Sequence, residues 1–186
     1  FARVLDSHIH HNGQLGIAAI GRDALFEGTE VAYNGEIEYE IGWERGGSKF
    51  AGSEGDVVRN NHVHHNIGPG LWSDVNAYDS LFEGNEVIGN TRSGIYYEIS
   101  YKAVIRNNYI EGNGFGQSDW LWGAGIVIAG SPDVEIYGNT VVGNADGIAG
   151  IEQDRVRGAR PALGVVDVHR VDADQHDPCV DERRGE

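Results

Sequence analysis

Two columns of turn residues constrain the fold of this chain more than any other feature of its sequence. When the repeats are aligned on the turn before each second apolar strand, the first column contains Ser7, Thr29, Asn61, Asn85, Asn108 and Asn139. The second column lies five residues later and contains Asn12, Asn34, Asn66, Asn90, Asn113 and Asn144. Both columns keep the spacings 22, 32, 24, 23 and 31, and repeats of this length indicate a stacked architecture.

Within each repeat, apolar residues alternate over runs of four to six residues, which is the period of a strand rather than a helix. The repeat at 77–100 contains three such runs, SLFE, EVIGN and GIYYEIS, separated by turns. The alignment places Ile95 under Ile126 and Val87 under Ile110, which would fill the interior of a stack. We therefore predict an all-β solenoid of about six coils with three short strands per coil.

The stacked turn residues have a physical explanation. An asparagine at a fixed turn can bond its side-chain amide to the equivalent amide one coil away, at the strand spacing of about 4.8 Å. We therefore interpret both columns as structural. Two histidine clusters occupy matching places, HIHHN at 8–12 and HVHHN at 62–66. One coil without histidines separates them by two strand spacings, or about 10 Å, so we assign them no metal.

The turn columns and the order of the strands resemble those of right-handed parallel β-helix repeat proteins, the fold of pectate lyases and polygalacturonases. The resemblance covers about residues 3–154. The stretches GPGLWSDVN and GIYYEISYKAVIRNN are also similar to a bacterial secreted subgroup whose activity is generally unassigned. The resemblance implies a right-handed β-helix and an extracellular or cell-surface location. It implies little about chemistry, because the same coil serves lyases, hydrolases, epimerases and adhesins.

The repeat pattern divides the chain in two. Residues 1–154 are predicted to form the β-helix, truncated at its N-terminus because the chain opens inside a repeat. Residues 155–186 contain no asparagine and no aromatic residue, and only one apolar run, LGVVDV. We expect an atypical polar tail there, either disordered or a poorly formed cap, and a shifted reading frame would also explain the change of composition.

The charge of the chain excludes some partners. With 14 basic and 29 acidic residues the net charge is −15, which argues against a nucleic-acid surface. No apolar run reaches the roughly 18 to 20 residues that a membrane-spanning helix needs, so we expect no membrane insertion. We also expect a monomer.

The third strand of each coil carries the most informative side chains. Aligned on their first inward residue, these strands read IEYEIG, LWSDVN, IYYEIS and IVIAGS, from Ile37, Leu71, Ile95 and Ile126. The alternation then predicts Trp72 and Tyr96 outside the coil, where their rings could stack on sugars. Two residues further on it predicts an outward stack of carboxylates, formed by Glu40, Asp74 and Glu98.

The repulsion within such a stack must be offset, because like charges directly across a strand pair are destabilising. A bound Ca²⁺ would relieve it, and oxygen-rich carboxylate clusters suit that ion. A raised pKa on one carboxyl would also relieve it and would prepare an acid for catalysis. Glu40, Asp74 and Glu98 are therefore candidate catalytic residues and candidate Ca²⁺ ligands. Lys102, Lys49 and Arg45 are the candidate bases.

Two insertions border the same strands. One coil carries GWERGGSKFAGSEG after the strand assigned to Glu40, and another carries GFGQSDWLWGA before the strand that begins at Ile126. They contribute Trp43, Trp120 and Trp122, so every tryptophan of the chain borders one face. Long loops beside a minimal repeat are usually functional, and we expect these two to flank a substrate cleft, one on each side.

These features indicate an extracellular carbohydrate-active protein that binds and cleaves a polysaccharide. A hydrolase would use one carboxyl as the acid and another as base or nucleophile. A lyase would use Ca²⁺ on the carboxylates to neutralise a uronate while a basic residue removes the proton. The alternative is a non-catalytic glycan-binding or surface-adhesion repeat protein, and a third possibility is an incomplete enzyme whose site requires further coils.

Overall fold

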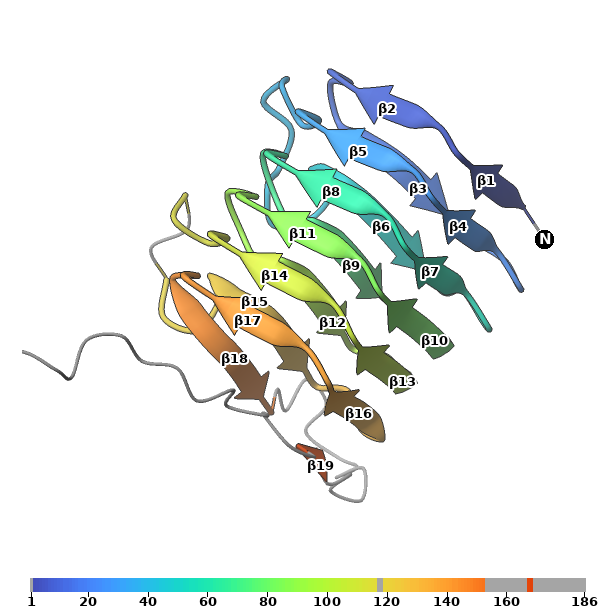
Figure 1. The fold of residues 1–186 in the computed structure, drawn as a ribbon, viewed down its shortest axis with the longest axis vertical. Coiled ribbons are helices and arrows are strands. Elements are labelled where there is room, and N and C mark those ends of the chain that lie inside the picture. Colours follow the sequence, from blue (N-terminus) through green and yellow to red (C-terminus); the bar gives the residue numbers. More distant parts are fainter. Residues whose placement is uncertain (1, 117–118, 153–166, 169–186) are drawn as a thin grey trace, which may run out of the picture.

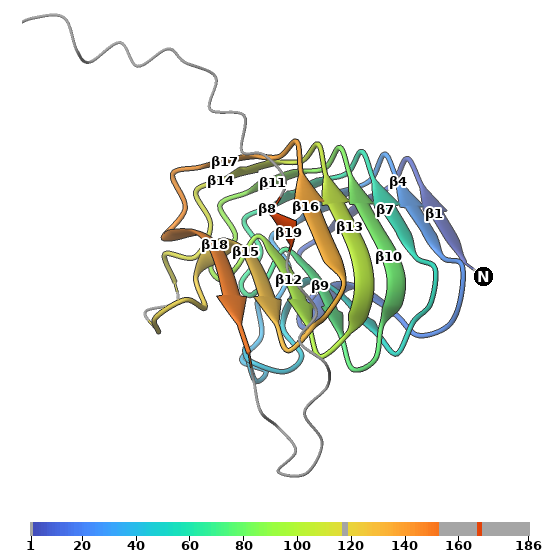
Figure 2. The ribbon, with the colours of Figure 1, turned by 90° about the horizontal axis from the view of Figure 1, so that it is seen from below.

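The chain folds as a three-sided parallel β-helix without α-helices in the part that is described. The computed structural model describes residues 2–116 and 119–152, and the backbone of 167–168. Successive coils stack from the N-terminus onward, and every coil contributes one strand to each of three sheets (Figures 1 and 2). The prediction of an all-β solenoid with six coils of three strands is confirmed.

The three sheets, here named A, B and C, contain only parallel pairs. Sheet A consists of β1 (Arg3–Leu5), β4 (Leu25–Glu27), β7 (Val57–Arg59), β10 (Tyr78–Glu83), β13 (Tyr101–Arg106), β16 (Val134–Tyr137) and β19 (Asp167–Val168). Sheet B consists of β2 (His8–His10), β5 (Glu30–Ala32), β8 (His62–His64), β11 (Glu86–Ile88), β14 (Tyr109–Glu111) and β17 (Thr140–Val142). Sheet C consists of β3 (Leu15–Ala19), β6 (Gly46–Ala51), β9 (Leu71–Asp74), β12 (Ile95–Glu98), β15 (Ala124–Ala129) and β18 (Asp146–Ile151).

The interior is a column of apolar side chains from all three sheets. Its most buried members include Val58, Phe82, Ile105, Val63, Val87, Ile110, Leu71, Ile95 and Ile126. Ile95 lies against Ile126, and Val87 against Ile110, as the alignment predicted. The alternation of strand residues thus buries one side chain in two and leaves the other for the outer face.

The asparagine columns form two ladders of side-chain bonds, one at each end of the sheet B strands. In the second column the amide of Asn66 donates to Asn90 over 2.9 Å, and the amide of Asn90 donates to Asn113 over 2.9 Å. In the first column Asn61, Asn85, Asn108 and Asn139 are linked in the same way. The structural interpretation of these columns is confirmed.

The register assigned to the second coil is wrong. Ile37 is 61% exposed rather than inward, and the third strand of this coil is β6, nine residues further along. The strand begins there because Gly47 lies directly against the next coil, where a Cβ atom would stand 2.6 Å from the carbonyl oxygen of Gly70. Residues 36–45 therefore leave the coil as a loop, although their apolar alternation imitates a strand.

The remaining predictions about the organisation of the chain concern its ends. The tail predicted at 155–186 lies outside the described residues, apart from β19, which pairs with β16. The described part of the chain contains no helix with the length and apolarity that crossing a membrane requires.

Candidate functional site

The outer face of sheet C carries the predicted aromatic and acidic side chains on its third and fourth coils. Trp72 of β9 pairs with Tyr96 of β12, while their neighbours Leu71 and Ile95 pair inside the core. Asp74 and Glu98 follow two residues later on the same face. The two carboxylates therefore occupy consecutive coils, about one strand spacing of 4.8 Å apart.

Glu40 does not belong to this pair, which corrects the predicted stack of three carboxylates. Because β6 begins at Gly46, the residue that pairs with Asp74 is Ala51. Glu40 lies in the 36–45 loop, where its carboxylate accepts a hydrogen bond from the backbone of Gly42 over 3.2 Å.

Lys49 occupies the centre of the outer face and neutralises Asp74. Its ammonium lies 2.8 Å from a carboxylate oxygen of Asp74, and these two side chains are only 12% and 4% exposed. The same ammonium lies 3.6 Å from the ring centre of Trp72 and donates to the backbone carbonyl of Trp43. An ion pair, a cation–π contact and a loop contact thus meet at one lysine that is mostly shielded from solvent.

The fourth coil adds a phenol and a guanidinium to the same face. Tyr96 shares a hydrogen bond with Glu98, and burial together with that carboxylate raises the pKa of the Tyr96 phenol far above its usual value. Arg92 lies near Tyr96, Glu98, Asp119 and Glu40, and burial lowers the pKa of its guanidinium. The face therefore combines the carboxylates of Asp74 and Glu98 with two cations, Lys49 and Arg92, rather than presenting uncompensated negative charge.

The two insertions cover this face from one corner of the solenoid. Residues 36–45 and 114–123, of which 117 and 118 are not described, both run between a sheet B strand and a sheet C strand, and their loops project from the same edge (Figure 1). The expectation that they flank the face on opposite sides is wrong. Arg92 lies between them and donates to the carbonyl of Ile41 over 3.0 Å.

The loops bury the aromatic pair that was expected to stack on sugar rings. Trp72 is 0% exposed and Tyr96 is 5% exposed. Their rings stack 5.3 Å apart, and Trp122 packs edge-on against Tyr96 at 5.9 Å. In this arrangement neither ring offers a face to a ligand, which corrects the prediction. The loop tryptophans do: Trp43 is 63% exposed and Trp120 is 82% exposed.

Two of the three candidate bases lie away from the carboxylate pair. Lys102 belongs to β13 of sheet A, where it pairs with Asp79 over 3.0 Å. Arg45 donates to the backbone carbonyl of Gly35 and anchors the base of its loop. Of the three, only Lys49 contacts Asp74 directly. The position of Lys49 beside Trp72 was predictable, because aligning Gly47 with Gly70 at the start of their strands brings the two residues into register.

Possible metal ligands divide between two faces. On sheet C, the set Glu40, Asp74 and Glu98 is not assembled, since Glu40 lies in its loop and Asp74 already has a cation. On sheet B, Glu30, His62 and His64 each offer a ligand atom within 4.8 Å of the others. This second group was not anticipated, because the histidine clusters were compared only with one another.

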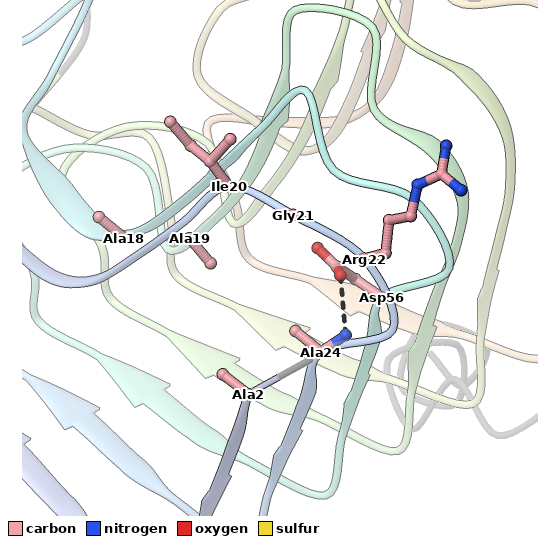
Figure 3. A pocket seen from close by; sticks show the side chains of 8 residues that line it. All are labelled: Ala2, Ala18, Ala19, Ile20, Gly21, Arg22, Ala24 and Asp56. Carbon is pink, nitrogen blue, oxygen red and sulfur yellow. Dashed lines mark hydrogen bonds between the residues drawn. The ribbon is translucent and has the colours of Figure 1, made fainter.

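A hollow of about 390 Å³ lies around the turn that follows β3, near the N-terminal end of the solenoid (Figure 3). It is lined by Ala2, Ala18, Ala19, Ile20, Gly21, Arg22, Ala24 and Asp56. Asp56 is buried and accepts a hydrogen bond from the backbone of Ala24 over 3.2 Å, and burial raises the pKa of its carboxyl. None of the predicted site residues contributes to this hollow.

Comparison with known proteins supports the fold and leaves the chemistry open. No curated protein matches the chain. A family model described as the right handed beta helix region matches residues 2–155, which is most of the chain. Together with three parallel sheets in register along six coils, this match shows that the chain belongs to the right-handed β-helix family.

Proposed function

We propose that this chain is an extracellular or cell-surface protein that binds a polysaccharide with the loops at the corner between sheets B and C. The observation that carries the proposal is the exposure of Trp43 and Trp120, one on each loop. Large apolar rings that remain in solvent at 63% and 82% exposure normally mark interaction sites. The flat ring of tryptophan is suited to stacking on the face of a sugar.

The spacing of the loops suits an extended ligand. They emerge from the second and fifth coils, so their bases are three strand spacings, or about 14 Å, apart. The short turns of the third and fourth coils lie between them, and Arg92 stands in this interval as a hydrogen-bond donor. A polymer that runs parallel to the stack would contact both tryptophans and pass over Arg92.

The charge of the chain favours a neutral glycan. At a net charge of −15, a polyuronate would be repelled unless cations screened it. The ion pair of Lys49 with Asp74 agrees with this choice, because Asp74 already occupies the Lys49 ammonium.

The test is a titration of neutral and uronate polysaccharides against the protein and a W43A/W120A variant. Loss of two stacking rings should weaken binding of the preferred neutral glycan by about a hundredfold, at 1–1.5 kcal/mol for each ring. Tyr109→Ala removes an exposed ring from sheet B and should leave the affinity unchanged. Equal affinities for all three proteins would refute the proposal.

Cleavage of the bound polymer is the second candidate function, favoured by the adjacency of Asp74 and Glu98. Two carboxyls about 5 Å apart have the spacing of a retaining glycosidase, in which one acts as acid and the other as nucleophile. In a lyase, Ca²⁺ would neutralise the uronate, and Lys49 would first have to leave its ion pair with Asp74 as the neutral amine. It would then remove the proton beside the carboxylate while the glycosidic oxygen leaves and a double bond forms in the sugar. Either reaction requires the loops to open, since Asp74 and Glu98 are buried beneath them.

New reducing ends and the ultraviolet absorbance of unsaturated sugars distinguish these reactions. Reducing ends alone indicate hydrolysis, whereas both signals, lost on chelation, indicate a Ca²⁺-dependent lyase. Asp74→Asn and Glu98→Gln should abolish either reaction while leaving binding within about threefold, because the loop tryptophans remain. Turnover that survives both substitutions would remove this pair from the mechanism, and absence of turnover leaves the binding protein.

A further inference from the structure

The outer face of sheet B carries a column in which histidine and glutamate alternate. The register places His8 beside Glu30, Glu30 beside His62 and His62 beside Glu86, on the neighbouring strands β2, β5, β8 and β11 (Figure 1). His64 points to the same side as His62, because Val63 between them is in the core. Glu30 comes from the coil that was expected to separate the two histidine clusters.

Glu30 connects these clusters through both of its carboxylate oxygens. Oε1 lies 3.0 Å from Nε2 of His64, and Oε2 lies 2.6 Å from Nδ1 of His8. The rings of His62 and His64 are 4.1 Å apart between centroids. One ligand atom from each of Glu30, His62 and His64 falls within 4.8 Å of the other two.

We propose that Glu30, His62 and His64 bind a divalent transition-metal ion of the Zn²⁺ class. Two imidazole nitrogens and one carboxylate oxygen match the ligand set that this class prefers, whereas Ca²⁺ and Mg²⁺ favour oxygen alone. Ligand atoms around a tetrahedral Zn²⁺ with bonds of about 2 Å are about 3.3 Å apart. The present separations reach up to 4.8 Å, so metal binding would require the exposed His62 side chain to move toward Glu30 and His64.

The surrounding side chains hold two of these ligands in position. Nδ1 of His64 lies 2.9 Å from Nδ1 of His65, which leaves Nε2 of His64 directed at Glu30. His65 is itself stacked on Tyr33, with ring centroids 5.3 Å apart. His8 orients Glu30 through its second oxygen, so the ligands of the site are supported as metal ligands usually are.

The site has three protein ligands and an open side. His64 is buried, Glu30 is half-buried and His62 is exposed, so the fourth coordination position faces solvent. In the metal-free protein His62 lies 3.9 Å from Glu86, and metal binding would replace this weak pair.

The experiment is calorimetric titration of Zn²⁺ into chelator-treated protein, with Ca²⁺ and Mg²⁺ as competing cations. The starting protein is a H169A/H176A/C179A variant, because these three residues, which follow the described coils in the sequence, are also potential ligands. It should bind one equivalent of Zn²⁺, and neither Ca²⁺ nor Mg²⁺ should displace it. Co²⁺ bound in the same place should give visible absorption that Zn²⁺ abolishes.

Further substitutions in this variant identify the ligands. His64→Ala and Glu30→Gln should each weaken Zn²⁺ binding by more than a hundredfold, and His65→Ala by about tenfold. His10→Ala, a change on the same sheet outside the group, should leave the affinity unchanged, and circular dichroism should show that every variant is folded. The absence of saturable Zn²⁺ binding, or an affinity indifferent to His64→Ala and Glu30→Gln in folded protein, would overturn the proposal.

Discussion

The outer faces of sheets B and C belong to the same coils, yet they meet solvent in opposite ways. On sheet C, the outward Trp72 is buried and forms a second apolar cluster with Tyr96, against which Trp122 of the 114–123 loop packs. On sheet B, the outward His62 and Glu86 remain exposed. Both sheets present the same apolar face to the core, so the difference arises from the corners that precede them.

The corner before sheet B leaves no room for an insertion. Two-residue turns connect the strands of sheets A and B, and each contains a residue in the left-handed region. This residue is Asp6 in the first coil and a glycine or asparagine in the next five, such as Asn60 at φ 56° and Gly84 at φ 63°. The asparagine ladder follows immediately, which ties each turn to the next coil. The corner before sheet C varies in length, from the short connection at 143–145 to the long one at 33–45, and the chain re-enters the coil through a glycine. A solenoid can therefore vary one face while the other stays constant.

The largest loss of stability should come from truncating a buried side chain on the covered outer face of sheet C. Trp72→Ala removes a fully buried ring and a cation–π partner of Lys49, and we expect a loss of about 4 kcal/mol in the free energy of unfolding by urea. His62→Ala, on the same coil but on the exposed face of sheet B, should change the free energy of unfolding of the metal-free protein by less than about 0.5 kcal/mol. Similar losses from both substitutions would show that the two faces do not differ.

The asparagine ladder should be the next most sensitive feature. Asn90 donates to Val63 and Asn113 and accepts from the backbone and amide of Asn66. Asn90→Ala leaves several buried groups without partners, and we expect a loss of about 3 kcal/mol in thermal or urea unfolding. Asn144→Ala, at the partly exposed end of the same described ladder, should lose less than half as much. Equal losses would mean that the ladder contributes nothing beyond each local turn.

These expectations separate what sequence patterns can predict from what they cannot. The ladder and the pairing of Ile95 with Ile126 were predictable, because both follow from the spacing of one residue type along the chain. The position of Ile37 was not, since alternation in a loop looks like alternation in a strand. The glycine column that includes Gly47 and Gly70 would have located β6, because a side chain at these positions meets the next coil.

The burial of an outward side chain depends on the conformation of the loops that cover it, and no local sequence pattern predicts that conformation. Trp72 was correctly expected to point outward, but its cover comes from residues that lie far away in the sequence. The histidine group on sheet B was within reach of the alignment, because Glu30 stands in the same column as His8 and His62. It was overlooked because the carboxylate came from a coil without histidines.

The burial of Tyr96 on the covered face of sheet C should also affect the stability of the protein at alkaline pH. Because the pKa of Tyr96 is raised above its ordinary value of 10.0 by burial, the stability linked to this phenol is complete below pH 10 and declines as the pH rises further. Tyr96→Phe should cost about 1 kcal/mol at neutral pH, through the lost bond to Glu98, and should lose less stability than wild type above pH 10. Thermal unfolding between pH 7 and 11 measures both effects.

Two other tyrosines bear on this experiment, one as a second contributor to the alkaline decline and one as a control. Burial raises the pKa of Tyr97 to about 12, so part of the alkaline decline should persist in Tyr96→Phe. Tyr39→Phe, in the 36–45 loop with an exposed ring, should follow the wild-type curve. A curve for Tyr96→Phe that coincides with wild type above pH 10 would show that solvent reaches the Tyr96 phenol.

The smallest effect should come from the charged pairs on the bare surface of sheet A. Arg59 of β7 makes two bonds to the carboxylate of Glu27, at 2.9 and 3.0 Å, and Arg106 bonds Glu83 on the following coils. Both members of the Arg59 pair are partly in solvent, where water and salt screen the attraction. A double-mutant cycle with Arg59→Ala and Glu27→Ala should give a weak coupling that vanishes at high salt. Coupling that persists in high salt would mean that an ion pair on an uncovered face stabilises the coil as the shielded pair of Lys49 and Asp74 does on the covered one.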